Sequence, residues 1–430
     1  MSAKMKHFLI EPTDVLFCRD AIPMSAGAGR GAGCRMPFPS TLHEAMRASL
    51  LKYTGREEQD KSLRGRRGKL ISTHAFNSLR VAGPFAWSRD HKALLPVPLD
   101  VVLHKGTHAD SKPLRKLDLL VQPNAPFAAS AGGSLQPACV PVATTPPDKN
   151  GTVQGWWNVT QYRDYLAGEN AALEPLKTEQ LWQPEYRIGL QIDPLSFAAA
   201  GGQLFAGTYM RMNEHARLYF DADLAGVADS EACEQDALQS LEWLLLGGER
   251  RLSRMSSQED DPLAVLREAP KIKDSSGPVL LKWVLATPAV FAHGHIPGWC
   301  FHPDKKPDGI PVGRVRLSYS KKRSRRNSTA LPGKAALVSW CLGKPQTVSG
   351  WDTIEQRAKS TQLAVPAGSV YYFLCENAET ANALATKLHW RPRSDRYGEK
   401  GCGYGLCSFD VNLHPASHDI DSLCTQVFKI

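Results

Sequence analysis

The pattern of apolar and polar positions opens the chain with strands, a loop and a helix. Residues 6–19, KHFLIEPTDVLFCR, contain two apolar, strand-forming runs around a Pro-Thr-Asp turn. A glycine-rich loop at 27–33 follows. Behind it, Thr41 and Glu44 have the spacing of a capping box, and apolar residues then recur at helical intervals. This part of the chain therefore predicts a strand, a basic glycine loop and a helix.

A related order recurs twice further along the chain. Residues 234–246, EQDALQSLEWLLL, carry an apolar stripe at helical spacing that ends at two glycines, and the basic segment 249–254 follows. Residues 379–389 predict another helix. The glycine loop 401–405 comes after it and leads into a strand. Both stretches predict a helix, a glycine loop and an extended segment.

These patterns predict two modules of the α+β class. The polar segment 256–278 is punctuated by prolines and is typical of a linker, and new strands begin at Val279 and at 370–375. A chain of 430 residues also exceeds the roughly 250–300 residues of a single core. We expect modules at 1–255 and 276–430.

The first half is longer than one small module requires, and the excess lies at about 103–183. This stretch is rich in Pro, Gly, Ser and Thr and contains the Trp156-Trp157 and Tyr162/Tyr165 pairs. It predicts a long insertion with functional contacts. Such aromatic pairs serve local packing more often than base stacking.

The charge balance favours a polyanionic partner. The chain has 52 Lys and Arg against 43 Asp and Glu, a net charge of +9, so nucleic acid is the leading expectation. No apolar run approaches the ~20 residues that span a bilayer, and ten scattered cysteines fit reduced thiols. We therefore expect a cytoplasmic protein without a membrane contact.

Motifs for cofactors and for most catalytic chemistry are missing. No glycine loop is followed by the lysine and hydroxyl residue of a phosphate-binding loop, and Gly27–Ala32 matches a dinucleotide motif in letters only, because prolines separate it from the helix. The acidic run 259–261 sits in the linker, where we expect it to be solvated. No cofactor is predicted.

A zinc site is a weaker alternative. His293, His295, Cys300 and His302 lie close together in the chain, and Cys402 and Cys407 are further thiols, but the spacing is irregular for a structural site. We predict no metal.

His43 is the one candidate catalytic residue. It lies in the first turn of the helix behind the early glycine loop, where it could face a phosphate and act as general base or acid in metal-free RNA cleavage. A histidine that caps or packs at this place is the commoner case.

Six segments in this order resemble a known family. They are Ile10–Asp20, Pro37–Arg47, Leu95–Asp100, Arg187–Asp193, Leu246–Arg250 and Gly403–Gly405. Together they resemble the RAMP proteins of CRISPR systems, and among these the third subunit of the Cmr, or type III-B, RNA-guided effector complex.

The resemblance implies two ferredoxin-like (RRM-like) domains in tandem, each with a glycine-rich loop after its last helix. The insertion at about 103–183 in the first is longer than the family requires. It also implies a non-catalytic subunit for antiviral defence that holds the 5′ tag of the crRNA. Implied partners are the large polymerase-like subunit and the backbone RAMP subunits, with the target RNA contacted indirectly. Related RAMP endonucleases process precursor CRISPR RNA, which keeps His43 as the alternative.

The glycine loops and the basic clusters suit single-stranded RNA. Glycines allow amides to approach a phosphate, guanidinium groups bind phosphates as forks, and tyrosines stack on bases. We expect one basic surface whose affinity falls with salt. The predicted RNA-binding residues are Arg19, Arg30, Arg35, Arg250, Arg251, Arg254, Arg391, Arg393, Arg396, Lys400, Gly401, Gly403, Tyr404 and Gly405.

Overall fold

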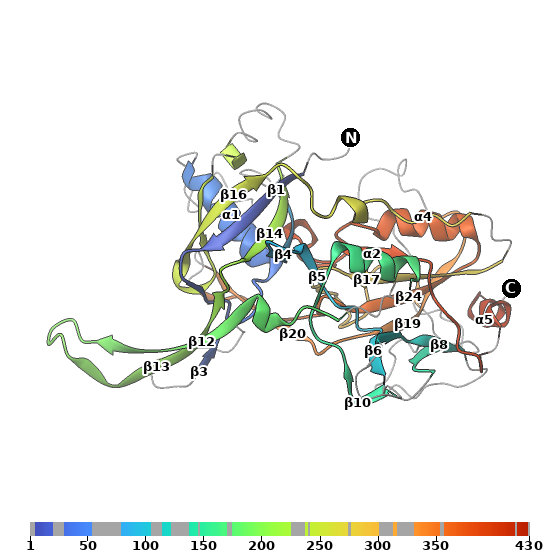
Figure 1. Cartoon of the computed structure of the whole chain (residues 1–430), viewed down its shortest axis with the longest axis horizontal. Coiled ribbons are helices and arrows are strands. Elements are labelled where there is room, and N and C mark those ends of the chain that lie inside the picture. Colours follow the sequence, from blue (N-terminus) through green and yellow to red (C-terminus); the bar gives the residue numbers. More distant parts are fainter. Residues whose placement is uncertain are drawn as a thin grey trace.

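Two antiparallel sheets dominate the computed structural model of the chain (Figure 1). The structure describes residues 5–19, 30–53, 79–104, 114–121, 137–144, 147–169, 174–224, 237–239, 241–273, 277–300, 313–315, 331–352, 357–417 and 419–428. None of the helices within these ranges combines the length and hydropathy that a membrane-spanning helix requires.

The first sheet has seven strands in the order β11-β5-β4-β14-β1-β16-β15. Helix α1, Pro39–Tyr53, covers one face, where Leu42 and Met46 pack against Phe8 and Ile10 of β1. The strands are β1 Lys6–Pro12, β4 Arg80–Ser88, β5 Lys92–Pro96, β11 Trp156–Asn158, β14 Ala216–Asp223, β15 Trp243–Leu246 and β16 Arg251–Gln258.

The second sheet has five strands in the order β18-β19-β24-β17-β25. Helix α4, Ala378–Leu388, covers it through Leu384 and Leu388. Every residue of β17 is buried, including Lys282 in the middle of its otherwise apolar sequence. The strands are β17 Val279–Leu285, β18 Gly313–Arg314, β19 Ala335–Cys341, β24 Val370–Cys375 and β25 Gly405–Ser408.

The two sheets repeat one strand order. In the first, β1 lies between β14 and β16 with β4 beyond β14, and in the second, β17 lies between β24 and β25 with β19 beyond β24. The predicted mixed α and β character is confirmed. The boundaries 1–255 and 276–430 stay a prediction.

The two halves share one hydrophobic core. It contains Leu9 and Tyr219 of the first sheet together with Leu280 and Val284 of the second. The halves therefore cover part of each other's sheets, and their relative position is fixed by side-chain packing.

The insertion forms small sheets and a helix that pack on the second half. Ala138 N donates to Val338 O at 2.8 Å, and Ser339 Oγ donates to Cys139 O at 2.8 Å. Its aromatic pairs pack locally, as predicted, with Tyr162 fully buried. The elements are β6 Val101–His104, β7 Leu114–Lys116, β8 Asp118–Val121, β9 Cys139–Val142, β10 Pro147–Thr152, α2 Val159–Ala167 and the 3-10 turn η2 Thr178–Gln180.

A long hairpin projects from the body of the molecule (Figure 1). It consists of β12, Trp182–Ile192, and β13, Ala199–Met212, and we call it the arm. At its base β2, Val15–Leu16, pairs antiparallel with β13, and β3, Arg30–Ala32, pairs parallel with it.

Short elements complete the chain. They are η3 Gly248–Arg250, η4 Ala264–Leu266, β20 Gln346–Val348, β21 Trp351–Asp352, β22 Arg357–Ala358, β23 Gln362–Ala364, η5 Gly398–Lys400 and α5 Ile420–Phe428.

The helix predicted at 234–246 is largely wrong. Of its described residues only 237–239 are helical, and 243–246 form β15 at the edge of the sheet. Leu244 and Leu246 are buried while Trp243 and Leu245 are exposed, which is the alternation of a strand. An unbroken apolar run fits both periods, so tertiary pairing decided between them.

Candidate RNA-binding surface

Three segments predicted to bind RNA meet around Phe17. Gly248 N donates to Phe17 O at 2.7 Å, and Cys18 N donates to Gly33 O at 3.0 Å. A Cβ atom on Gly33 would lie 2.1 Å from the Phe17 ring. Gly33 of the early loop and the Gly247-Gly248 pair are thus required for close packing around Phe17, whereas Gly27 and Gly29 lie outside the described residues.

The basic edge lies at this junction. We use this name for Arg19, Arg35 and Arg250, which are all exposed. A Cβ atom on Gly248 would lie 3.8 Å from Arg19 Cδ, so the first and last of the three segments are in contact. Among the described residues no carboxylate pairs with Arg35 or Arg250.

The loop that carries Arg250 has an uncommon backbone. Gly247 has φ 77° and ψ −163°, a conformation reserved for glycine, and Glu249 and Arg250 have φ of 57° and 48°. Two successive non-glycine residues in the left-handed region occur where the surrounding structure holds them in place. The loop is therefore shaped by its contacts with Phe17.

Arg251 supports this junction and does not present a free charge. Its guanidinium pairs with Glu249 and lies 3.8 Å from Asp14, and it stacks 5.2 Å from the centre of the Tyr209 ring. Arg187 lies 5.5 Å from the same ring. These contacts give Arg251 a structural role in the protein, and its RNA contact stays a prediction.

Two further arginines lie outside the basic edge. Arg254 Nε is 3.5 Å from a Glu242 oxygen, and the residue lies opposite Trp243 on the sheet. Arg30 lies in β3, but its side chain is outside the described part of the structure. Its RNA contact stays a prediction.

The late glycine loop is buried inside the protein, so the prediction that its amides face RNA is wrong. Gly401 N donates to Gly398 O, and Gly403 N donates to Pro288 O at 2.9 Å. Cβ atoms would lie 2.8 Å from Val81 O at Gly401 and 2.3 Å from the Trp283 indole nitrogen at Gly405. Gly401 permits close packing of the two halves, while Gly403 and Gly405 permit close packing within the second half.

Tyr404 cannot stack on a base in this structure. Its side chain is 6% exposed and packs 5.8 Å from the Trp390 ring, and burial raises its pKa to about 12. Its amide donates to Thr287 Oγ1 at 2.9 Å. The tyrosine is part of the shared core, which corrects its predicted role.

Of the basic side chains around the late loop, two are bound within the protein and two are exposed. Lys400 pairs with Glu44 of α1, and Arg393 Nε donates to the carbonyl of Lys387 at 2.5 Å, so both are used inside the protein. Burial lowers the pKa of Arg393. Arg391 and Arg396 are both exposed, and Arg396 donates a hydrogen bond to Gln362 Oε1.

His43 does not face a phosphate site. It is 5% exposed on the buried side of α1, and burial lowers its pKa to about 4. Its Nδ1 lies 4.0 Å from Glu44 Oε1. At neutral pH it is an uncharged, weakly basic residue in the interior, which is a poor position for a general acid or base.

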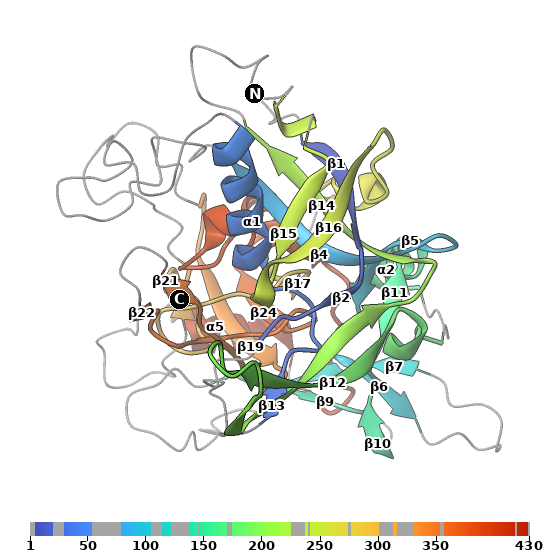
Figure 2. The same cartoon turned by 90° about the vertical axis from the view of Figure 1, so that its left-hand side faces the viewer.

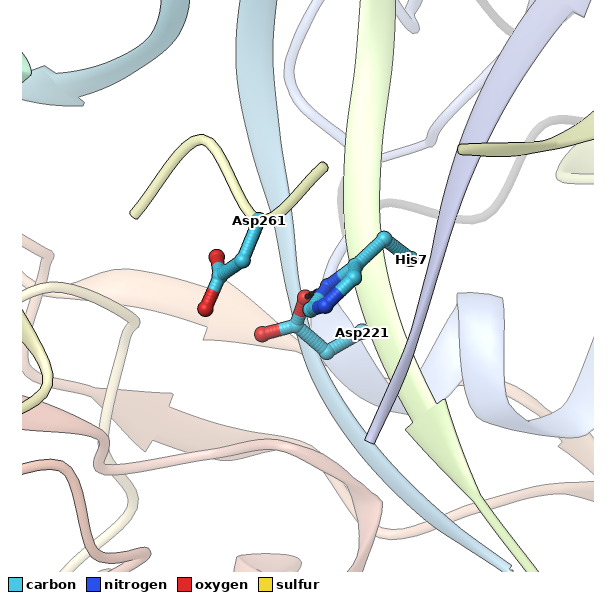
Figure 3. A group of neighbouring side chains, drawn as sticks. All are labelled: His7, Asp221 and Asp261. Carbon is cyan, nitrogen blue, oxygen red and sulfur yellow. Dashed lines mark hydrogen bonds and ion pairs between the residues drawn. The ribbon is translucent and has the colours of Figure 1, made fainter. Parts of the chain in front are cut away.

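The described residues of the zinc alternative do not gather. Among the described residues, the group whose potential ligand atoms lie within 4.8 Å of one another is His7, Asp221 and Asp261 (Figure 3). His302 is outside the described ranges. Cys300 is buried, and burial raises the pKa of its thiol.

An arginine already pairs with both carboxylates of the His7, Asp221 and Asp261 group. Arg267 donates to Asp221 Oδ2 at 2.7 Å and to Asp261 Oδ2 at 2.8 Å, and His7 Nδ1 lies 2.9 Å from Asp221 Oδ1. Arg267 also stacks 4.4 Å from the Trp390 ring of the second half. The predicted solvation of Asp261 is therefore wrong, and the cluster ties the linker to both halves.

The arm was not predicted from the sequence, although apolar residues alternate along it with the period of a strand. Large apolar side chains alternate along β12 and continue through the tip, and Leu195 is 91% exposed. They are Tyr186, Ile188, Leu190, Ile192, Leu195 and Phe197. A patch of this kind marks an interaction site.

Charged residues fix the arm at its base. Asp14 accepts hydrogen bonds from Arg187 and Arg211, and these bonds lower its pKa to about 2. Glu185 pairs with the same two arginines. Ion pairs thus hold the base of the arm against the body, beside the basic edge.

Comparison with known proteins decides the family. The model of the family described as CRISPR-associated protein (Cas_Cmr3) matches residues 8–409. The chain belongs to this family. The resemblance to RAMP-type Cmr subunits that the sequence motifs carry is thereby confirmed.

Solved structures are similar over most of the chain but at low identity. "Cryo-EM structure of the Type III-B Cmr-beta bound to cognate target RNA" contains a chain with 14% identity and a TM-score of 0.43, covering 85% of this chain and 86% of that one. "Crystal structure of Csm3-Csm4 subcomplex in the type III-A CRISPR-Cas interference complex" gives 12% identity, a TM-score of 0.38, and 85% and 92% coverage. No curated protein matches the chain.

Proposed function

We propose that this chain is a guide-RNA-holding subunit of a type III-B CRISPR effector complex, acting in defence against invading nucleic acid. The proposal rests on the basic edge, where three segments distant in sequence meet at Phe17 and expose Arg19, Arg35 and Arg250. Family membership supplies the biological setting.

In this proposal the basic edge binds phosphates of the 5′ tag of the crRNA. Guanidinium forks suit phosphate oxygens, and a strained, preformed loop loses little conformational entropy when it binds. Arg391 and Arg396 extend the positive surface on the second half. The buried late loop contributes by holding the halves together.

The protein partners are the large polymerase-like subunit and the backbone RAMP subunits, and target RNA is reached through the guide. The exposed apolar side chains of the arm support contacts with other components of such an assembly. The repeated strand order supports two ferredoxin-like domains in tandem, the first carrying the insertion.

We infer a binding role without RNA cleavage by this chain. The burial of His43 and its lowered pKa favour this role over precursor processing. Labelled repeat RNA incubated with the pure chain and EDTA is expected to stay intact, and cleavage that disappears in His43→Ala would establish the nuclease instead.

Binding of labelled crRNA by alanine variants tests the proposal. Replacement of Arg19, Arg35 and Arg250 together removes up to three phosphate contacts, so the slope of log K against log salt should decrease by about 2, at about 0.7 per single-strand phosphate. The exposed Arg163 on α2, changed to Ala, is the control and should leave the slope unchanged. An unaltered slope in the triple variant would reject the basic edge as the RNA site.

A further inference from the structure

Tyr209 connects the base of the arm to the loop that carries Arg250. It lies in β13, is 3% exposed, and its hydroxyl donates to Glu249 Oε1 at 2.7 Å. Glu249 directly precedes Arg250 of the basic edge. Figure 2 shows β2 between the β15–β16 hairpin and the arm, and Phe17 follows β2 in the chain. A side chain of the arm therefore reaches the loop of the basic edge.

Packing fixes the ring of Tyr209. It stacks on the Phe17 ring with the centres 4.5 Å apart, and the guanidinium groups of Arg251 and Arg187 lie 5.2 and 5.5 Å from its centre. A Cβ atom on Gly207 would lie 3.0 Å from Tyr209 Cε2, so the glycine at this position leaves room for the ring. The hydroxyl is thereby presented to the loop at a defined place.

The loop needs support from its surroundings. Glu249 and Arg250 both have positive φ, of 57° and 48°, a conformation that is sterically unfavourable for residues with a Cβ atom. The Glu249 carboxylate is held twice, because it accepts from the Tyr209 hydroxyl and pairs with Arg251. In the described part of the structure no hydrogen bond or ion pair holds the Arg250 side chain. The place of its guanidinium therefore depends on how Glu249 is held.

We propose that Tyr209 is a positioning residue for the guide RNA. Through Glu249 it holds the loop in the conformation that presents the Arg250 guanidinium to a phosphate. The ring is buried, so Tyr209 acts on the RNA without touching it, and the arm takes part in guide binding through its base. This inference rests on the proposed function, because it requires RNA at the basic edge.

Tyr209→Phe tests the role of the hydroxyl, because it keeps the packed ring. If the loop then spends about four fifths of its time relaxed, the crRNA dissociation constant rises by about fivefold. The matched control is Tyr371→Phe, which removes a hydroxyl that donates to His295 O at 2.6 Å in the second half. The control should lose a similar amount of thermal stability and bind crRNA like wild type. Wild-type affinity in Tyr209→Phe, or an equal loss in the control, would overturn the proposal.

A double-mutant cycle separates positioning from a general structural role. Because the hydroxyl acts through Arg250, Tyr209→Phe should change crRNA affinity by less than about 1.5-fold when Arg250→Ala is already present. A purely structural role predicts the same loss in both backgrounds. That additive result would overturn the proposal.

Hydrogen exchange of the free chain provides a readout without RNA. The Gly248 amide donates to Phe17 O at 2.7 Å and so reports on opening of the loop. It should exchange at least about threefold faster in Tyr209→Phe and at the wild-type rate in Tyr371→Phe. An unchanged rate in Tyr209→Phe would contradict the positioning role. If wild type binds no crRNA, the proposed function itself fails, whereas failure of the inference alone leaves wild-type binding intact.

Discussion

Gly247→Ala is the sharpest perturbation of the basic edge, because it changes the loop and removes no charge. Gly247 has φ 77° and ψ −163°, and a Cβ atom there would lie 2.8 Å from Phe17 O and 3.4 Å from Cys18 Sγ. A residue with a Cβ atom in such a backbone conformation raises the free energy of the folded state by about 1–3 kcal/mol. The variant loop therefore relaxes away from Phe17 and must regain the native shape to bind RNA.

The expected loss of affinity follows from this cost. If binding must restore about 2 kcal/mol of strain, crRNA affinity falls by roughly thirtyfold at 1.4 kcal/mol per factor of ten. Fluorescence anisotropy with a labelled 5′ tag measures the affinity. Thermal unfolding of the same samples shows whether the fold is retained.

Gly294→Ala is the matched control. Gly294 also has a positive φ, 71°, but nothing lies within 4 Å of the Cβ position, and it belongs to the second half. It should bind RNA like wild type. Wild-type affinity in Gly247→Ala, or an equal loss in both variants, would refute the assignment of the loop.

Three further outcomes follow, two from the buried late loop and its contacts and one from Arg251. Tyr404→Phe should leave RNA affinity unchanged within about twofold, because the ring is 6% exposed, and a large loss in a binding assay would restore the tyrosine as a base contact. Glu44→Gln should lower stability at pH 7 by about 1–2 kcal/mol after solvent screening, as seen by denaturant unfolding, because Glu44 pairs with Lys400. Burial raises the pKa of Glu44, but the pairing with Lys400 outweighs burial and lowers the pKa from 4.5 to about 2. The stability difference between wild type and Glu44→Gln should therefore disappear as the pH falls from about 4.5 to 2. A stability difference that persists at about pH 2 contradicts the pairing. Arg251→Gln should reduce thermal stability as well as RNA affinity, since it breaks the contacts with Tyr209 and Glu249, and reduced affinity at full stability would indicate a direct phosphate contact.

The sequence predicted correctly those elements whose apolar pattern fits only a helix or only a strand. The apolar run of β17, the strand β24 and the helices α1 and α4 lie where the sequence places them. The run at 243–246 does not, because leucines in succession satisfy both helical and strand periods until a neighbouring strand pairs with them.

The function of the glycines was the harder inference. Glycine repeats at 401–405 correctly indicate close approach to something, but the sequence does not state whether the partner is a phosphate or Val81 of the other half. Likewise, exposed and neutralised arginines look alike in sequence. Arg250 and Arg251 are adjacent, yet only the structure shows that Asp14, Glu249 and Tyr209 engage the second.

RNA-to-protein crosslinking in the assembled complex, mapped to peptides, tests the central claim most directly. The account predicts guide-RNA adducts in the peptides that contain Arg19, Arg35 and Arg250, and none at Tyr404. Adducts confined to other parts of this chain, or to other subunits alone, would contradict it.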